Sequence, residues 1–156
     1  MKLDEIDRKI LSELSRNAKI SHRNLAKLCG TARQTVAARI KKLERAGAIK
    51  GYRAILDYEK VGYRSFFVLF LKLDTFDKEL TENYIKSMKK DANVMYDASI
   101  TGEWDVMQIL AFEGAKDYEN YINSLRNKNR KLIKDSKSHA VLRFYKTSDE
   151  YVPLIQ

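Results

Sequence analysis

Apolar residues in this chain recur at a helical spacing in the first third, and at a mixture of strand and helix spacings after it. Near the start, Ile6, Ile10 and Leu14 stand four positions apart, which predicts a first helix. Asp4 and Asp7 precede or open this run, where acidic residues suit the helix dipole. The first third is therefore expected to be helical.

Two more helices are predicted, and a single glycine separates them. Ser21 offers an N-cap for a short helix, which Gly30 breaks. The segment TARQTVAARIKKLERAG then predicts a third helix, capped by Thr31 and ended by Gly47. Its apolar residues form one stripe, at Val36, Ile40 and Leu43. Two short helices, a glycine turn and a third helix with a polar start are typical of a helix-turn-helix.

The last two thirds alternate between strands and helices. Strand patterns cover SFFVLFLKLD, NVMYDASI, DVMQILAF and HAVLRFYK, and helical patterns cover FDKELTENYIKSMKK and AKDYENYINSLRNK. The order βαββαβ predicts a ferredoxin-like sheet with both helices on one face. Because no spare element remains to cover the other face, a second copy of the chain is expected there.

Positive charge is concentrated in the first part of the chain. Residues 1–56 hold 14 lysines and arginines against 5 acids, whereas residues 57–156 hold 16 of each. The whole net charge of +9 therefore belongs to the predicted helical part. A small basic domain indicates a polyanionic partner, most often nucleic acid, although a solvated basic face would have the same composition.

The third predicted helix has a polar face opposite its apolar stripe. Arg33, Gln34 and Thr35 lie nearest its start, where a recognition helix meets base edges. Ala38 in the middle of that face is small enough to let a helix approach a groove floor, and Arg39 lies on its flank. A three-helix bundle with a charged outer face would show the same periodicity, but the charge division favours DNA binding.

Catalysis, metal binding and membrane insertion have little support in the sequence. His22 and His139 lie in different predicted modules, and no phosphate-binding or metal-ligand motif occurs. No apolar run is long enough to span a bilayer. The single cysteine, Cys29, fits a reducing cytoplasm. We expect a cytoplasmic protein that is not an enzyme and carries no cofactor.

Several segments resemble the Lrp/AsnC (leucine-responsive/asparagine-synthesis) transcription regulators. LDEIDRKILSEL, KISHRNLAKLCG, ARIKKLERAGAIKGYRAILD and VGY resemble the helix-turn-helix of that family, ITGEWDV resembles its Gly-x-aromatic-Asp hairpin, and YK…VPL resembles its tail. Two segments depart from the family pattern: Thr31-Ala32 stands where many members have Leu-Ser, and KDSKSHA lacks a Pro-Gly-Val.

The resemblance implies an α+β fold with two domains. Residues 3–64 would form a winged-type helix-turn-helix domain, and residues 65–156 a ligand-responsive, oligomerising ferredoxin-like βαββαβ sandwich. Ile49 to Leu56 would be a linker strand that pairs between subunits. The implied assembly is a homodimer that associates further to a tetramer or octamer. The residues expected to contact double-stranded DNA are Ser21, His22, Arg23, Thr31, Arg33, Gln34, Thr35, Ala38, Arg39, Lys42, Lys50 and Arg53.

The hairpin TGEWD has both a structural and a functional interpretation. Gly102 would supply a positive φ and Asp105 would cap a backbone amide in a tight turn, which leaves the exposed Trp104 unexplained. By resemblance, the hairpin lines a pocket between dimers for a small molecule, typically an amino acid. The residues expected to bind this effector are Thr101, Gly102, Trp104 and Asp105.

The sequence thus predicts a sequence-specific, effector-modulated DNA-binding regulator. An architectural, weakly specific protein that wraps DNA without an effector would have the same fold and charge. Sensitivity of binding to base changes within one site distinguishes the two.

Overall fold

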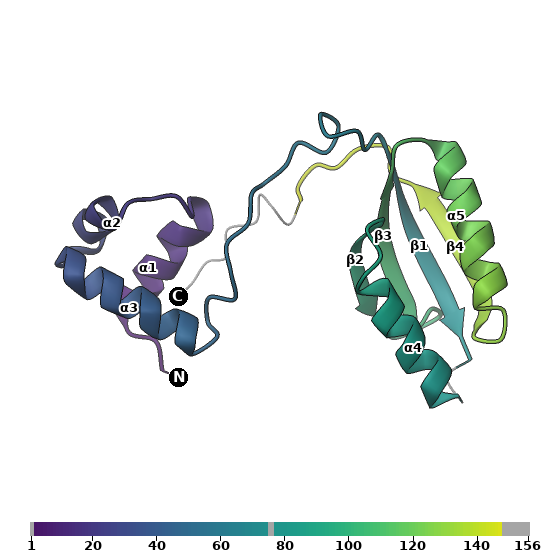
Figure 1. The fold of residues 1–156 in the computed structure, drawn as a ribbon, viewed down its shortest axis with the longest axis horizontal. Helices are drawn as coiled ribbons and strands as arrows, with labels where there is room; N and C mark the ends of the chain where they lie inside the picture. The colour runs from purple at the N-terminus through teal and green to yellow at the C-terminus, as the bar shows by residue number, and fades with distance from the viewer. Residues whose placement is uncertain (1, 75–76, 148–156) are drawn as a thin grey trace. The chain divides into compact units, whose positions relative to one another are not determined.

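The computed structural model describes residues 2–74 and 77–147, and its contacts divide the chain into two compact units. Residues 2–55 belong to the first unit together with residues 145–147, and Leu56–Phe144 form the second. The first unit contains three helices, and the second contains a sheet with two helices (Figure 1). The predicted family-like tail YK…VPL lies partly outside the described residues.

The first unit is a bundle of α1 (Glu5–Arg16), α2 (His22–Cys29) and α3 (Arg33–Arg45). Its core contains the predicted apolar stripe of α3, and Ile10, Leu25, Val36 and Leu43 are fully buried. Cys29 is buried in the same core as a free thiol. Burial of these side chains holds the three helices together, since helices this short are marginal in isolation.

Side chains cap the starts of α1 and α2, and of these two caps only Ser21 was predicted. Asp4 caps α1 and forms a capping box with Asp7. The Ser21 hydroxyl accepts a hydrogen bond from the Asn24 amide (3.2 Å) at the start of α2. Gly30 ends α2 in the left-handed region with φ of 63°, which a residue with a Cβ rarely adopts.

The prediction that Thr31 caps α3 is wrong. The helix begins at Arg33, so its N-cap is Ala32, which has no side-chain acceptor. Thr31 is used in the turn instead, where its amide donates to the Ala26 carbonyl (3.0 Å). The first turn of α3 therefore keeps amide groups that no capping side chain satisfies.

The second unit has the predicted βαββαβ order. Its elements are β1 (Ser65–Leu73), α4 (Lys78–Met88), β2 (Val94–Ser99), β3 (Val106–Phe112), α5 (Ala115–Lys128) and β4 (Ile133–Ala140). The strands are antiparallel neighbours in the order β2-β3-β1-β4, so β4 is an edge strand. The ferredoxin-like arrangement is confirmed.

Both helices pack on one face of this sheet (Figure 1). Tyr84 of α4 and Ile122 of α5 belong to one core cluster with Leu69, Leu71 and Leu110. Because side chains alternate across a strand, the neighbouring residues of β1 and β3 lie on the opposite face. This helix-free face carries Phe66, Val68, Phe70, Met107 and Ile109, all only half-buried.

Two predicted strands differ from the structure. The last strand is Ile133–Ala140 rather than HAVLRFYK, because the polar segment IKDSKSHA supplies the backbone partners of β1. The predicted linker strand, Ile49 to Leu56, forms no strand within a single chain, so its pairing between subunits stays a prediction. In the described part of the chain no other strand pairs with it, and an unpaired segment has no ladder of hydrogen bonds.

Within the described residues, no helix is both long and apolar enough to cross a membrane.

Candidate DNA-binding surface and effector hairpin

Helix α3 presents a polar, positively charged face to solvent. Val36, Ile40 and Leu43 are buried against α1 and α2. The residues on the opposite side are all exposed, and they are Gln34, Ala38, Lys41, Lys42 and Arg45. At the helix start Arg33 is exposed and Thr35 is half-buried. The face therefore combines hydrogen-bonding side chains at its start with lysines and an arginine along its length.

Acidic side chains are nearly absent around this face. Residues 21–53 contain nine lysines and arginines and one acid, Glu44. The Glu44 carboxylate accepts a hydrogen bond from the Tyr52 hydroxyl (3.0 Å). Lys41, Lys42 and Arg33 have no ion pair among residues 2–74 and 77–147. Their charge is available to a polyanion.

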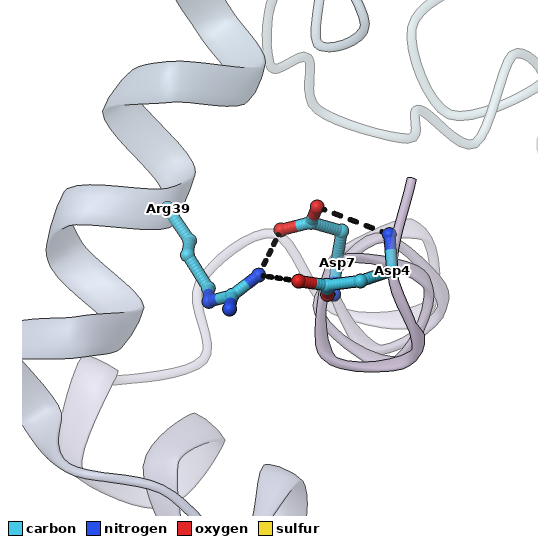
Figure 2. A network of polar contacts seen from close by, with 3 residues as sticks. All are labelled: Asp4, Asp7 and Arg39. Atoms are coloured by element: carbon cyan, nitrogen blue, oxygen red, sulfur yellow. Dashed lines mark hydrogen bonds and ion pairs between the residues drawn. The ribbon is translucent and has the colours of Figure 1, made fainter. Parts of the chain in front are cut away.

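Arg39 differs from the other predicted DNA contacts because its guanidinium turns toward α1 (Figure 2). Its Nη1 donates to Asp4 Oδ2 (2.6 Å) and to Asp7 Oδ1 (2.7 Å). Asp7 is 1% exposed, so one of these ion pairs is buried on its acidic side. Hydrogen bonds to Asp4 and then Asp7 raise the pKa of Arg39.

The same two carboxylates also close the capping box of α1. The Asp7 amide donates to Asp4 Oδ1 (2.9 Å), and the Asp4 amide donates to Asp7 Oδ2 (3.3 Å). The bond from the Asp7 amide, followed by that from Arg39, lowers the pKa of Asp4. Sequence reasoning assigned both acids to the helix dipole alone. It missed that Arg39 links the cap of α1 to the middle of α3.

The remaining predicted DNA contacts lie at the start of α2, in the turn between α2 and α3, and in the segment after α3. Ser21 is occupied as a cap, while His22 and Arg23 are exposed on the first turn of α2. After α3, Lys50 and Arg53 are exposed and line a hollow of about 330 Å³ together with Tyr52 and residues of α1. Thr31 is half-buried in the turn between α2 and α3.

The hairpin between β2 and β3 is a tight turn around Gly102, whose φ is 117°. The predicted positive φ is confirmed. The Ile100 amide donates to the Asp105 carbonyl (3.0 Å) and closes the turn. Asp105 does cap a backbone amide, but the amide belongs to Leu73 at the end of β1 (2.8 Å) and not to the turn. Its Oδ1 accepts from Lys72 Nζ (3.2 Å).

These contacts keep the Asp105 carboxylate ionised. The hydrogen bond from the Leu73 amide, followed by that from Lys72, lowers the pKa of Asp105 below its ordinary value of 3.8. Trp104, the neighbouring residue, is half-buried rather than exposed as predicted. Its indole packs on Phe70 of the helix-free face, with ring centroids 6.3 Å apart.

A cavity of about 280 Å³ lies beside the hairpin, between α4 and the β2 and β3 strands. Of the four predicted effector residues only Asp105 lines it, while Thr101 and Gly102 are exposed on the turn. Its polar lining comes from Thr81, Tyr84, Lys89, Asp97, Ser99 and Asp105.

A buried amide lies among the cavity's polar residues. Gln108 is fully buried, and its Nε2 donates to the Tyr84 hydroxyl (3.1 Å) and to Asp97 Oδ1 (3.0 Å). Burial, with the nearby Asp97 charge, raises the pKa of Tyr84, so its hydroxyl stays protonated. Gln108 was not among the predicted site residues, because its partners Tyr84 and Asp97 come from other elements. In the described residues no cluster of three or more metal-ligating side chains occurs.

Comparison with known proteins places this arrangement in a family. The AsnC-type helix-turn-helix domain matches residues 3–44. An uncharacterised HTH-type transcriptional regulator of Pyrococcus abyssi is 32% identical over 92% of this chain and 95% of its own length. The chain belongs to the Lrp/AsnC family. Transcriptional regulator AzlB of Bacillus subtilis, 31% identical over 77% of this chain and 76% of its own length, is a further relative.

Solved structures of other regulators share this fold. LrpC of Bacillus subtilis has a TM-score of 0.80 at 25% identity and covers 95% of this chain and 100% of its own. A transcriptional regulator of Neisseria meningitidis in complex with L-Met has a TM-score of 0.87 at 24% identity, over 94% of each chain. This Lrp/AsnC chain is accordingly a transcriptional regulator with a DNA-binding helix-turn-helix, and not an enzyme.

Proposed function

We propose that this Lrp/AsnC regulator binds specific DNA sequences through α3, and that a small molecule, an amino acid, modulates its assembly or DNA affinity. The observation that carries the proposal is the exposed, acid-poor face of α3 with Arg33, Gln34 and Thr35 at its start. Those side chains would meet base edges, and Ala38 would allow close approach to the groove. Lys42, Lys50, Arg53, His22 and Arg23 would contact phosphates.

Two assigned DNA contacts have other partners as well. Ser21 caps α2, and Arg39 pairs with Asp4 and Asp7. We propose that Arg39 acts on DNA binding by orienting α3. The first turn of α3 has no capping side chain, so its backbone amides can donate to a DNA phosphate, and Thr31 lies beside them. A regulator acts where the DNA is, so the proposed compartment is the cytoplasm.

The effector part of the proposal rests on the hairpin and its cavity. A volume of about 280 Å³ suits a single amino acid and is smaller than most drug-sized pockets. The ionised Asp105 lines this cavity and would supply a negative group for an ammonium. The amides around Gly102 lie on the exposed turn outside the cavity lining, and they would donate to a carboxylate there. The Neisseria meningitidis neighbour, solved with L-Met, supports an amino acid as the class of ligand.

The decisive experiment is selection of bound sequences from a random duplex pool, with and without each amino acid. A sequence-specific regulator enriches one operator, and its enrichment changes with one or a few amino acids. An architectural protein enriches no single operator and loses little affinity on base changes, so a flat selection would contradict the proposal.

Gln34 and Lys42 should have different effects on DNA binding. Gln34→Ala should relax base preference at one or two operator positions by about 1–3 kcal/mol each, because a bidentate amide contact to a base is lost. Lys42→Ala should weaken all sequences about equally and lower the salt slope by about one. Titrations across single-base operator variants measure both. Indistinguishable profiles for the two variants would contradict these roles.

The helix-free face should bring two copies of the chain together. Val68 lies at its centre, between Ile109 of β3 and His139 of β4. Light scattering of the wild type should give at least twice the 18.2 kDa of one chain. Val68→Glu should give a folded monomer, because the charge is tolerated in water but not in an apolar interface. A wild type that stays monomeric at micromolar concentration would contradict this assembly.

A further inference from the structure

The zero net charge of residues 57–156 conceals a division inside the second unit. Residues 57–125 hold 8 lysines and arginines against 13 acids, whereas residues 126–144 hold 7 against a single acid, Asp135. Positive charge therefore gathers at the end of this unit as well as on the helix-turn-helix. Neither the proposed DNA-binding face nor the proposed effector site includes a residue of this second basic segment.

Most lysines and arginines of this segment lie along one edge of the sheet unit, and Lys137 of β4 is opposite Phe70 of the helix-free face. Six of them follow one another through the end of α5, the loop after it and the edge strand β4 (Figure 1). We name them the basic edge, and they are Arg126, Lys128, Arg130, Lys131, Lys134 and Lys137. All six side chains are exposed.

Most of the basic edge has no acidic partner. Lys134 pairs with Asp74 (3.2 Å), and Arg126 donates to the Ser136 hydroxyl (2.6 Å and 2.8 Å). The other four side chains of the basic edge form no ion pair with any residue in 2–74 or 77–147, and they are Lys128, Arg130, Lys131 and Lys137. Elsewhere on the unit, Lys86 pairs with Glu82 and Lys116 with Glu119.

Structural roles account for only part of the basic edge. Cations at a helix C-terminus favour the dipole, which explains Lys128, and lysines on an edge strand discourage unwanted pairing, which explains Lys137. Arg130 and Lys131 lie in the loop, where neither reason applies. With Lys128 they line a hollow of about 210 Å³ that contains no acidic side chain.

We propose that the basic edge binds the sugar-phosphate backbone of duplex DNA that flanks the operator. Exposed lysines and arginines in a row, with polar asparagines between them, match the charged and polar character of DNA interfaces. A protein partner would be expected to meet aromatic or apolar anchors, and residues 126–137 hold no aromatic residue and only the buried Leu132 and half-buried Ile133. This contact adds affinity without base specificity, which stays with α3.

The test compares two double variants of the full chain that remove the same charge. Lys128→Gln with Lys131→Gln alters the basic edge, and Lys86→Gln with Lys116→Gln alters paired lysines on the same unit. Each protein is titrated with a short duplex of the selected operator and with a long duplex that carries the operator between random flanks. On the long duplex, the salt slope of the basic-edge variant should fall by about two, because two phosphate contacts are lost.

The short duplex and the control variant should show no such change. Equal slopes for both variants on the long duplex would overturn the proposal. So would a basic-edge variant whose sedimentation changes without DNA while its long-duplex slope does not, because the partner would then be an acidic surface of another copy. Arg130→Gln, a single loop change, keeps the test valid if the double variant folds poorly. If the wild-type protein binds neither duplex, the DNA-binding role itself is contradicted. That result is distinct from a failure of the basic-edge proposal alone.

Discussion

Arg39→Ala should destabilise the three-helix unit by about 2–3 kcal/mol at neutral pH. The substitution leaves the buried Asp7 carboxylate beside Asp4 with no cation, and removing one partner from a buried pair costs more than the pair contributes. We place the loss below the full value for buried pairs, since Arg39 and Asp4 are partly exposed to water. Urea unfolding followed by helical circular dichroism measures it, and Trp104 fluorescence reports the other unit separately.

The same variant should bind the operator more weakly, but with an unchanged salt slope. A lost phosphate contact would lower the slope by about one, whereas a misplaced α3 weakens base contacts that do not depend on salt. Arg39→Ala combined with Asp7→Asn should recover most of the stability, because no buried charge remains and the amide oxygen can still accept the capping bond. A slope that falls by one would instead make Arg39 a phosphate ligand.

Asp105→Asn should abolish the effector response while DNA binding persists. The asparagine oxygen still accepts from the Leu73 amide, so the hairpin is retained, but the charge that an ammonium needs is gone. Because the pKa of Asp105 is lowered by the Leu73 amide and then by Lys72, the wild-type carboxylate is ionised at neutral pH. Calorimetric titration with each amino acid, run beside operator binding, measures the loss.

Glu103→Gln is the matched control for that variant. Glu103 is exposed on the same hairpin, and its substitution by Gln removes the same charge. This variant should keep the effector response. Trp104→Ala should act differently and loosen the higher assembly by about 2–4 kcal/mol, as expected when a large aromatic anchor is lost. If Asp105→Asn still responds to the amino acid, Asp105 only ties the hairpin to β1.

Local rules predicted the features of this fold that depend on neighbours in sequence. The buried stripe of α3, the Ser21 cap, the Gly30 break and the positive φ of Gly102 all follow from residue type and spacing. Strand β4 was misplaced because its residues are mostly polar. An edge strand is held by backbone hydrogen bonds to its neighbour, and these leave little trace in side-chain pattern.

Long-range side-chain contacts were the part that the sequence did not reveal. Arg39 and Asp7 are separated by 32 positions, and nothing in either local segment indicates that they meet. The partners of Asp105 likewise come from β1, 32 and 33 positions earlier. The candidate DNA face was predictable because one helix carries most of it, whereas the cavity beside the hairpin needs three elements to be placed first.

The packing of Trp104 on Phe70 has a practical consequence, because this indole is the chain's only one. The next residue along, Asp105, lines the cavity, so a single peptide unit separates the proposed effector site from the helix-free face. When the unlabelled protein is excited at a wavelength that its nine tyrosines do not absorb, its ultraviolet emission therefore originates at one point between these two surfaces. A shift in the emission wavelength on adding an amino acid would report ligand binding. A shift on dilution would report dissociation of the subunits, and neither measurement needs an attached dye.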